Sequence, residues 1–160
     1  MKKTLLLLAF FALIFSACKK SSTTSPTPVV DPTVQAKIDD DKIQAYITAN
    51  KITAVKDPSG LYYQILAPGA GTAPTTKSTI TVAYSGKLVD GTVFQTNPNF
   101  TRVLSGLIQG WQIGIPFVKP GGRILLLIPS ALGYGTSAQG STIPANSVLI
   151  FTIDLFAVQG

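Results

Sequence analysis

The chain has 160 residues, of which 46% are hydrophobic and 12% charged, with a formal net charge of +6, one Cys and no His. This size allows one ordinary domain with a tail, and the apolar content is sufficient for a buried core. The absence of His excludes His-assisted nucleophiles, the single Cys excludes an intrachain disulfide, and a zinc site would need carboxylates alone. We therefore expect any enzymatic activity to need no metal and no cofactor.

Residues 1–17 have the pattern of a secretory signal peptide, with two lysines at the start and an apolar run at 5–15 that is shorter than the ~20 residues of a membrane span. The sequence Phe15-Ser16-Ala17-Cys18 resembles a bacterial lipobox, with Phe where Leu, Ile or Val is usual. In this interpretation Cys18 is lipidated and becomes the mature N-terminus. The alternative is ordinary cleavage after residue 17, which leaves a free thiol.

Residues 18–32 are predicted to be the lipidated Cys followed by a flexible tether, because Ser, Thr and Pro predominate and large side chains are almost absent. We expect an exported protein, held by its lipid anchor at a membrane of a bacterial cell envelope, with the domain in the periplasm or at the cell surface. The body has no basic cluster interleaved with aromatic residues, which argues against nucleic acid as a partner.

Residues 33–57 are predicted to be a helical extension. Apolar side chains recur there three or four positions apart, at Val34, Ile38, Ile43, Tyr46 and Ile47. The run Asp39-Asp40-Asp41 lies mostly off that face, and the Gly and Glu of a calcium loop are missing downstream, so the run is expected to be solvated. The helix either packs on the domain or acts as a spacer.

Residues 58–160 are predicted to form the globular domain, and their pattern is that of strands. Apolar or alternating segments occupy 61–66, 79–88, 92–94, 123–128 and 147–158, with a hairpin turn at Asp90-Gly91. A short helix is expected at 109–115. The sequence therefore predicts an α+β fold with an antiparallel sheet and one short helix packed on it.

Five motifs in this domain carry a family resemblance. They are Val82-Ala83-Tyr84-Ser85-Gly86, Asp90-Gly91-Thr92-Val93-Phe94, Leu107-Ile108-Gln109-Gly110-Trp111, the run 121–135 (GGRILLLIPSALGYG), and Thr142-Ile143-Pro144-Ala145-Asn146 followed by Leu149-Ile150-Phe151. In this order and spacing they resemble the FKBP-type peptidyl-prolyl cis-trans isomerases, including secreted bacterial members with a preceding helix. The resemblance implies a curved antiparallel sheet of five to six strands wrapped on one short helix.

The resemblance also implies a site. The residues expected to form the catalytic pocket are Tyr84, Phe94, Trp111, Tyr134 and Phe151, and those expected to bind substrate are Gln95, Phe100, Leu107, Ile108 and Ile143. Trp111 is expected to form the floor, the N–H of Ile108 to bind a substrate carbonyl, the Tyr134 hydroxyl to bind the substrate, and Ile143 to cap the rim. Taken singly, aromatic residues on alternating strands are more often core residues, so this assignment depends on the joint pattern.

Two positions depart from the family pattern: Gln95 stands where Asp is typical, and Arg102 where another aromatic residue is common. We expect activity with Gln95 to survive but to be reduced, with weakened macrolide binding. Arg102 either opens one side of the pocket or pairs with a substrate carboxylate. The implied function is isomerisation of X-Pro bonds in exported proteins, with Pro-containing polypeptide segments as partners. The alternative is a non-catalytic FKBP-fold chaperone or peptide-binding module, whereas a purely structural lipoprotein would leave the pocket pattern unexplained.

Overall fold

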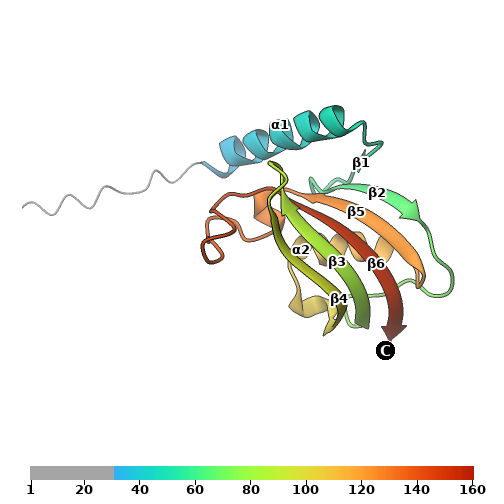
Figure 1. Cartoon of the computed structure of the whole chain (residues 1–160). Helices are drawn as coiled ribbons and strands as arrows, with labels where there is room; N and C mark the ends of the chain where they lie inside the picture. Colours follow the sequence, from blue (N-terminus) through green and yellow to red (C-terminus); the bar gives the residue numbers. More distant parts are fainter. Residues whose placement is uncertain (1–30) are drawn as a thin grey trace, which may run out of the picture.

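A computed structural model describes residues 31–160, which form one curved antiparallel sheet of six strands (Figure 1). The strands are β1 (Val55–Lys56), β2 (Tyr62–Ala67), β3 (Thr79–Leu88), β4 (Val93–Val103), β5 (Gly122–Ile128) and β6 (Leu149–Gln159). Their order in the sheet is β1-β2-β5-β6-β3-β4, so β6 joins the two parts of the sheet. The predicted α+β fold is confirmed.

The short helix α2 (Gln109–Gly114) packs against the concave face of the sheet. Two glycines permit the close approach of α2 to β5. A Cβ atom on Gly110 would lie 2.5 Å from Ile128, and one on Gly114 would lie 2.5 Å from Leu126. Because real Cβ contacts are longer, only Gly allows the helix to pack at this distance.

Three short 3-10 turns connect these elements: η1 (Leu104–Gly106), η2 (Ile115–Phe117) and η3 (Ser130–Leu132).

The main core lies between α2 and the sheet. Strand β3 contributes alternate side chains to it, Ile80, Val82 and Tyr84. The alternation predicted for β3 therefore separates a buried face from a half-exposed one.

The return strand β4 runs to Val103, whereas the sequence predicted only its start at 92–94. Pro98 in its middle obscured it, because proline ordinarily interrupts a strand. β4 lies at the edge of the sheet, where the missing N–H need not cost a ladder bond, and its pairing with β3 shifts register between Val82 and Tyr84.

Helix α1 (Pro32–Asn50) packs on the opposite face of the sheet from α2 (Figure 1). It begins where the Asp31 side chain accepts a hydrogen bond from the Thr33 N–H at 2.7 Å, and it ends at Lys51 in the left-handed conformation. Its Ile43 is fully buried with Tyr62 and with Leu127, Val148 and Ile150 in a second core. The choice left open by the sequence is thus settled: α1 packs on the domain.

The face that α1 buries differs from the one predicted. Val34 and Ile38 are 52% and 37% exposed, whereas Asp39 is only 1% exposed. Asp39 precedes Ile43 by one helical turn, so both face the sheet. The prediction that all three aspartates are solvated is therefore wrong for Asp39.

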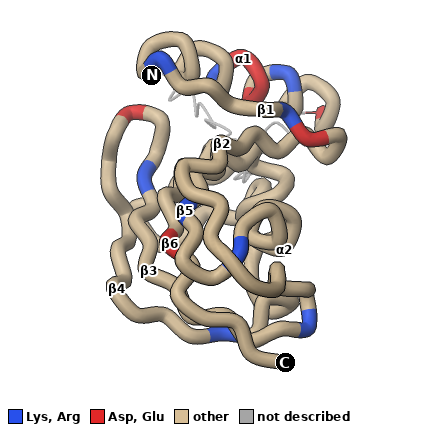
Figure 2. The backbone as a smooth tube through the Cα atoms, turned by 90° about the vertical axis from the view of Figure 1, so that its right-hand side faces the viewer, with Lys and Arg blue, Asp and Glu red and all other residues tan. Residues whose placement is uncertain are grey.

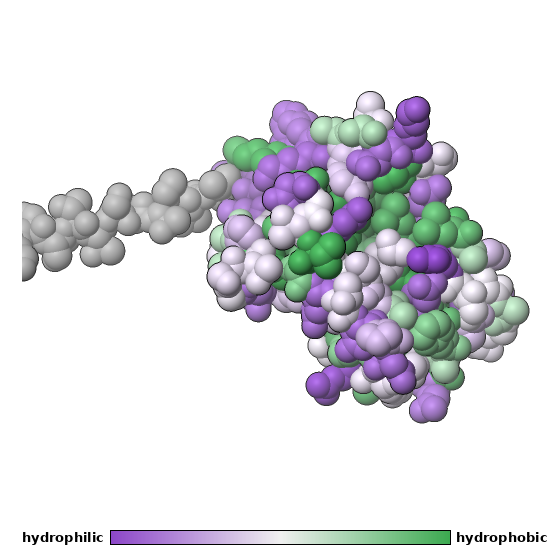
Figure 3. Space-filling view, viewed as in Figure 1, coloured by the Kyte–Doolittle hydropathy of each residue, from purple (hydrophilic) through white to green (hydrophobic). Residues whose placement is uncertain are grey.

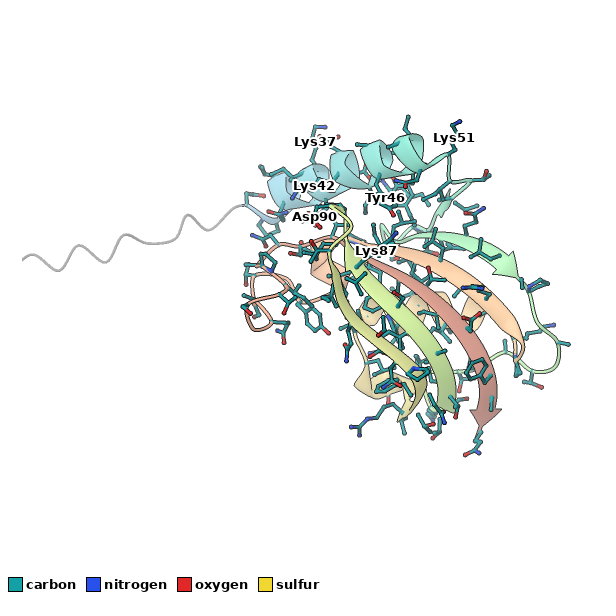
Figure 4. All side chains as sticks on the ribbon, viewed as in Figure 1. Lys37, Lys42, Tyr46, Lys51, Lys87 and Asp90 are labelled. Atoms are coloured by element: carbon teal, nitrogen blue, oxygen red, sulfur yellow. The ribbon has the colours of Figure 1, made fainter. Side chains whose placement is uncertain are left out.

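A cation–π contact joins α1 to the β3–β4 hairpin, with the Lys87 Nζ 5.6 Å from the Tyr46 ring centroid (Figure 4).

Charged residues of both signs are dispersed over the backbone without a continuous basic stripe (Figure 2). Over α1 the surface is mostly hydrophilic, and separate apolar patches lie over the sheet (Figure 3). None of the helices within residues 31–160 has the length and apolar character needed to cross a membrane.

Candidate functional site

An aromatic cavity of about 150 Å³ lies between α2, the strands β3, β4 and β6, and the loop that follows η3. Eight of the ten predicted pocket and substrate residues line it: Tyr84, Gln95, Phe100, Leu107, Ile108, Trp111, Tyr134 and Phe151. These residues span almost 70 positions in the chain, so only the folded sheet brings them together.

Trp111 forms the floor of this cavity from the first turn of α2. It is 4% exposed, and its ring meets those of Tyr84 and Phe151 edge-to-face, with centroids 5.1 and 5.2 Å away. Such edge-to-face pairs are a favoured aromatic geometry and hold the indole in one orientation. Its Nε1 is the one buried side-chain polar atom within residues 31–160 that lacks a hydrogen-bond partner.

Three strands supply the aromatic walls. Tyr84 comes from β3, Phe100 from β4 and Phe151 from β6, and the Tyr84 and Phe100 centroids are 5.6 Å apart. Burial raises the pKa of the Tyr84 hydroxyl, and the nearby Tyr134 adds to this effect. The cavity is therefore apolar and uncharged at neutral pH.

Few polar groups face this apolar surface. Ile108 precedes α2, and its carbonyl accepts hydrogen bonds from the N–H groups of Trp111 and Gln112, at 3.0 and 3.2 Å. Its own N–H has no acceptor anywhere in residues 31–160, and neither has the Tyr134 hydroxyl. Both donors therefore have no partner among the described residues; that they bind substrate stays a prediction.

The structure places two predicted residues outside the cavity lining. Phe94 lies behind Phe151, edge-to-face with centroids 5.5 Å apart, and supports that wall. Ile143 was expected to cap the rim, but it is only 6% exposed and belongs to the main core. A small bridge with Gln139 holds its backbone, so the side chain turns inward and not toward the rim.

Gly86 supports the site, although its motif, Val82-Ala83-Tyr84-Ser85-Gly86, predicts no role for it. A Cβ atom there would lie 2.5 Å from the Phe94 ring and 2.7 Å from the Phe151 ring. Gly86 therefore makes room for the aromatic wall. A glycine in the interior of an alternating strand is the signal that could have identified it.

The two departures from the family pattern lie on β4. Gln95 is exposed and lines the cavity, so a neutral amide stands at the rim. Arg102 is also exposed but is not among the lining residues. Within residues 31–160 no group of three or more His, Cys, Asp or Glu side chains is placed to hold a metal ion.

A family model for the FKBP-type peptidyl-prolyl cis-trans isomerases matches residues 71–156, which is more than half of the chain. The chain belongs to this family. The matched residues contain every residue that lines the aromatic cavity, together with Phe94 behind it.

Curated FKBP-type relatives are similar over about two thirds or more of the chain. The chain is 43% identical over 109 residues to the FKBP-type peptidyl-prolyl cis-trans isomerase FkpA of Buchnera aphidicola, covering 65% of this chain and 43% of the relative. It is 36% identical over 125 residues to the peptidyl-prolyl cis-trans isomerase Mip of Coxiella burnetii, covering 74% and 54%. The chain therefore spans about half the length of these FKBP relatives.

Among solved structures, FkpA from Escherichia coli is similar with a TM-score of 0.68 and 32% identity, covering 79% of this chain and 65% of FkpA. A peptidyl-prolyl cis-trans isomerase from Pseudomonas syringae has the same TM-score at 26% identity, covering 81% and 97%. The FKBP fold with a preceding helix is thus shared with other bacterial proteins.

Proposed function

We propose that this chain is a peptidyl-prolyl cis-trans isomerase that accelerates rotation about X-Pro bonds in exported proteins. The observation that carries the proposal is the small cavity with an indole floor, aromatic walls, and the unpaired N–H of Ile108 and hydroxyl of Tyr134. Membership of the FKBP family supports the same reaction.

The reaction needs a twisted amide and no covalent intermediate. Resonance keeps the X-Pro amide planar, with a barrier of ~18–20 kcal/mol, and unaided rotation takes tens to hundreds of seconds. Twisting the bond by a quarter turn breaks the resonance and reduces the charge separation between nitrogen and oxygen. An apolar pocket therefore favours the twisted form over the planar form, which is differential binding of the transition state.

Each part of the site has a role in this reaction. The prolyl ring lies on Trp111 between the aromatic walls, where water is excluded. The N–H of Ile108 and the hydroxyl of Tyr134 donate hydrogen bonds to the substrate backbone and hold the chain while the amide rotates. No proton is transferred, and no carboxylate, amine or guanidinium lines the cavity.

The size of the cavity limits what it can hold. About 150 Å³ suits a pyrrolidine ring, whereas drug-sized ligands occupy roughly 300–1,000 Å³. With the neutral Gln95 at the rim, we propose that macrolides bind this protein more weakly than they bind family members with Asp there. Substitution Gln95→Asp is expected to raise both macrolide affinity and turnover.

Isomerisation of a short Pro-containing peptide tests the proposal. Wild type is expected to accelerate the reaction, and Trp111→Ala to lose most of that acceleration. Phe156→Ala is the matched control, because Phe156 is an aromatic residue of β6 that is 53% exposed and lies outside the cavity. A wild-type rate no higher than that of Trp111→Ala would refute the enzyme and leave the alternative, a non-catalytic module that binds Pro-containing segments.

We further propose that the protein is exported and anchored by a lipid on Cys18, which lies outside the described residues. The support is the leader pattern at 1–17 and the following Cys. Full-length protein expressed in a bacterium is expected to partition into a detergent phase, and Cys18→Ser to move it to the aqueous phase. An unlipidated wild-type Cys18, established by mass spectrometry, would contradict the anchor.

A further inference from the structure

One buried charge in α1 is not explained by the docking of that helix alone. Asp39 is 1% exposed, yet it forms no salt bridge within residues 31–160. Its carboxylate accepts three hydrogen bonds, one on Oδ1 from Gln35 Nε2 at 2.7 Å and two on Oδ2 from Ser130. A buried carboxylate is costly unless it is fully hydrogen-bonded, so these three donors define its role.

The partner of Asp39 is Ser130, the first residue of η3, which Pro129 separates from the end of β5. Ser130 donates its backbone N–H at 2.8 Å and its Oγ–H at 2.6 Å to the same carboxylate oxygen. Hydrogen bonds of these lengths to a carboxylate are charge-assisted and are stronger than neutral ones. Ser130 is itself 2% exposed, so solvent does not compete for the contact.

Ser130 in turn frames Tyr134, which lines the cavity. The Ser130 carbonyl accepts hydrogen bonds from the N–H of Gly133 at 3.0 Å and from the N–H of Gly135 at 2.8 Å. These two glycines flank Tyr134, so its backbone is held on both sides by one peptide unit. A displacement of Ser130 therefore displaces the hydroxyl that is expected to contact the substrate.

Little else connects α1 to this loop. A hollow of about 600 Å³ separates them, lined among others by Pro32, Ala36, Ile43, Pro129, Leu132 and Thr136. Within the described part of the chain, Asp39 is the one residue of α1 that forms a hydrogen bond with residues 129–146. The carboxylate of Asp39 is thus the hydrogen-bonded link between helix α1 and this loop.

We infer that Asp39 is a positioning residue for catalysis, which acts through Ser130 to hold the Tyr134 hydroxyl at the prolyl pocket. This inference rests on the isomerase function proposed above and assigns a part in it to α1, outside the sheet. Asp39 touches neither the cavity nor the substrate, so its effect on turnover must pass through the loop.

The test compares Asp39→Asn with Asp41→Asn in full-length protein. Asp41 lies on the same helix, is exposed and pairs with Lys37, so its substitution is the matched control. We expect Asp39→Asn to lower kcat/KM about three- to ten-fold, the size of one ordinary hydrogen bond, because Asn can still accept part of the original set. Assays are run well below the melting midpoint of each variant, so that loss of folded protein is excluded.

A double-mutant cycle separates positioning from general stability. If Asp39 acts through Tyr134, Asp39→Asn changes kcat/KM less than about two-fold when Tyr134→Phe is already present. The shift in melting midpoint is expected to be the same on both backgrounds. An equal loss of turnover on both backgrounds, or no loss on either, would overturn the inference.

Hydrogen exchange provides a readout that does not depend on activity. The amides of Gly133 and Gly135 are expected to exchange faster in Asp39→Asn and at the wild-type rate in Asp41→Asn. Unchanged exchange in Asp39→Asn would overturn the anchoring itself. An inactive wild type with faster exchange in Asp39→Asn would instead refute the proposed isomerase and confine Asp39 to holding the loop.

Discussion

Gly86→Ala tests whether the aromatic wall depends on a missing side chain. The added Cβ would lie 2.5 and 2.6 Å from two carbons of the Phe94 ring and 2.7 Å from Phe151. Non-bonded carbons ordinarily sit about 3.5–4.0 Å apart, so each ring must retreat by about 1 Å. Phe151 has little room, because it is 3% exposed and packs against Trp111.

The expected cost follows from this geometry. Overpacking of this kind destabilises by about 1–3 kcal/mol, and the retreat of Phe151 narrows the prolyl pocket. Because a displacement of ~1 Å in a positioned site can cost two orders of magnitude in rate, we expect kcat/KM to fall at least about ten-fold. Denaturant unfolding measures the first effect, and isomerisation of a Pro-containing peptide the second.

The control for this substitution is Gly106→Ala. Gly106 has nothing within 4 Å of an added Cβ and no left-handed φ, so its unfolding free energy should change by less than about 0.5 kcal/mol. Adding Phe94→Leu to Gly86→Ala should recover part of the lost stability by removing one of the two clashing rings. Wild-type stability and turnover in Gly86→Ala would refute the reasoning, since alanine alone does not weaken a strand relative to glycine.

Three further substitutions test the floor of the cavity, the packing of α2 on the sheet, and the contact of Asp40 in α1 with Lys56 and Tyr62. Trp111→Phe removes an unsatisfied buried N–H but keeps a ring, so in urea unfolding it should cost less than Trp111→Ala, for which we expect ~3–5 kcal/mol. Gly114→Ala brings a Cβ to 2.5 Å from Leu126 and should cost about 1–3 kcal/mol by thermal unfolding, and a neutral result would contradict the packing of α2. A hydrogen bond from Lys56 and a smaller contribution from Tyr62 lower the pKa of Asp40. Ionised Asp40 therefore stabilises the fold at a pH above its ordinary pKa, and this stabilisation is lost as the pH falls through the lowered pKa. Asp40→Asn should therefore cost ~0.2–1 kcal/mol at pH 7 and progressively less below about pH 4, and a pH-independent difference would contradict this account.

Most of the fold could be predicted from the sequence, because the signals for its strands and turns lie within a few neighbouring residues. The alternation of β3 and the Asp90-Gly91 turn each lie within a few residues, and they predict a hairpin without knowledge of the rest of the chain. The sequence predicts the start of β4 but not its extent, because Pro98 is acceptable only in an edge strand and edge position is a property of the whole sheet.

The sequence predicts which residues line the cavity but not how all of their side chains pack. Eight of ten residues line the cavity because a family motif records their joint occurrence. Ile143 is buried in the main core by its packing with residues distant in the chain, which no local pattern encodes. Asp39 was misjudged for a similar reason: a charged residue is solvated by default, and only the position of Ser130, 91 residues away, supplies the donors that allow its burial.

The central position of β6 has a consequence for the order in which the domain folds. β6 follows the other five strands in the sequence, yet it alone bonds β5 on one side and β3 on the other. Until it is in place, β1, β2 and β5 can form one ribbon and β3 and β4 another, with no backbone ladder between them. The indole of α2 then has only part of its enclosure, and α1 lacks Ile150 as a docking surface. In newly made chains, the cavity and the surface on which α1 docks should therefore form together when β6 pairs. This step should be late and slow, because its contacts join residues that are far apart in the sequence.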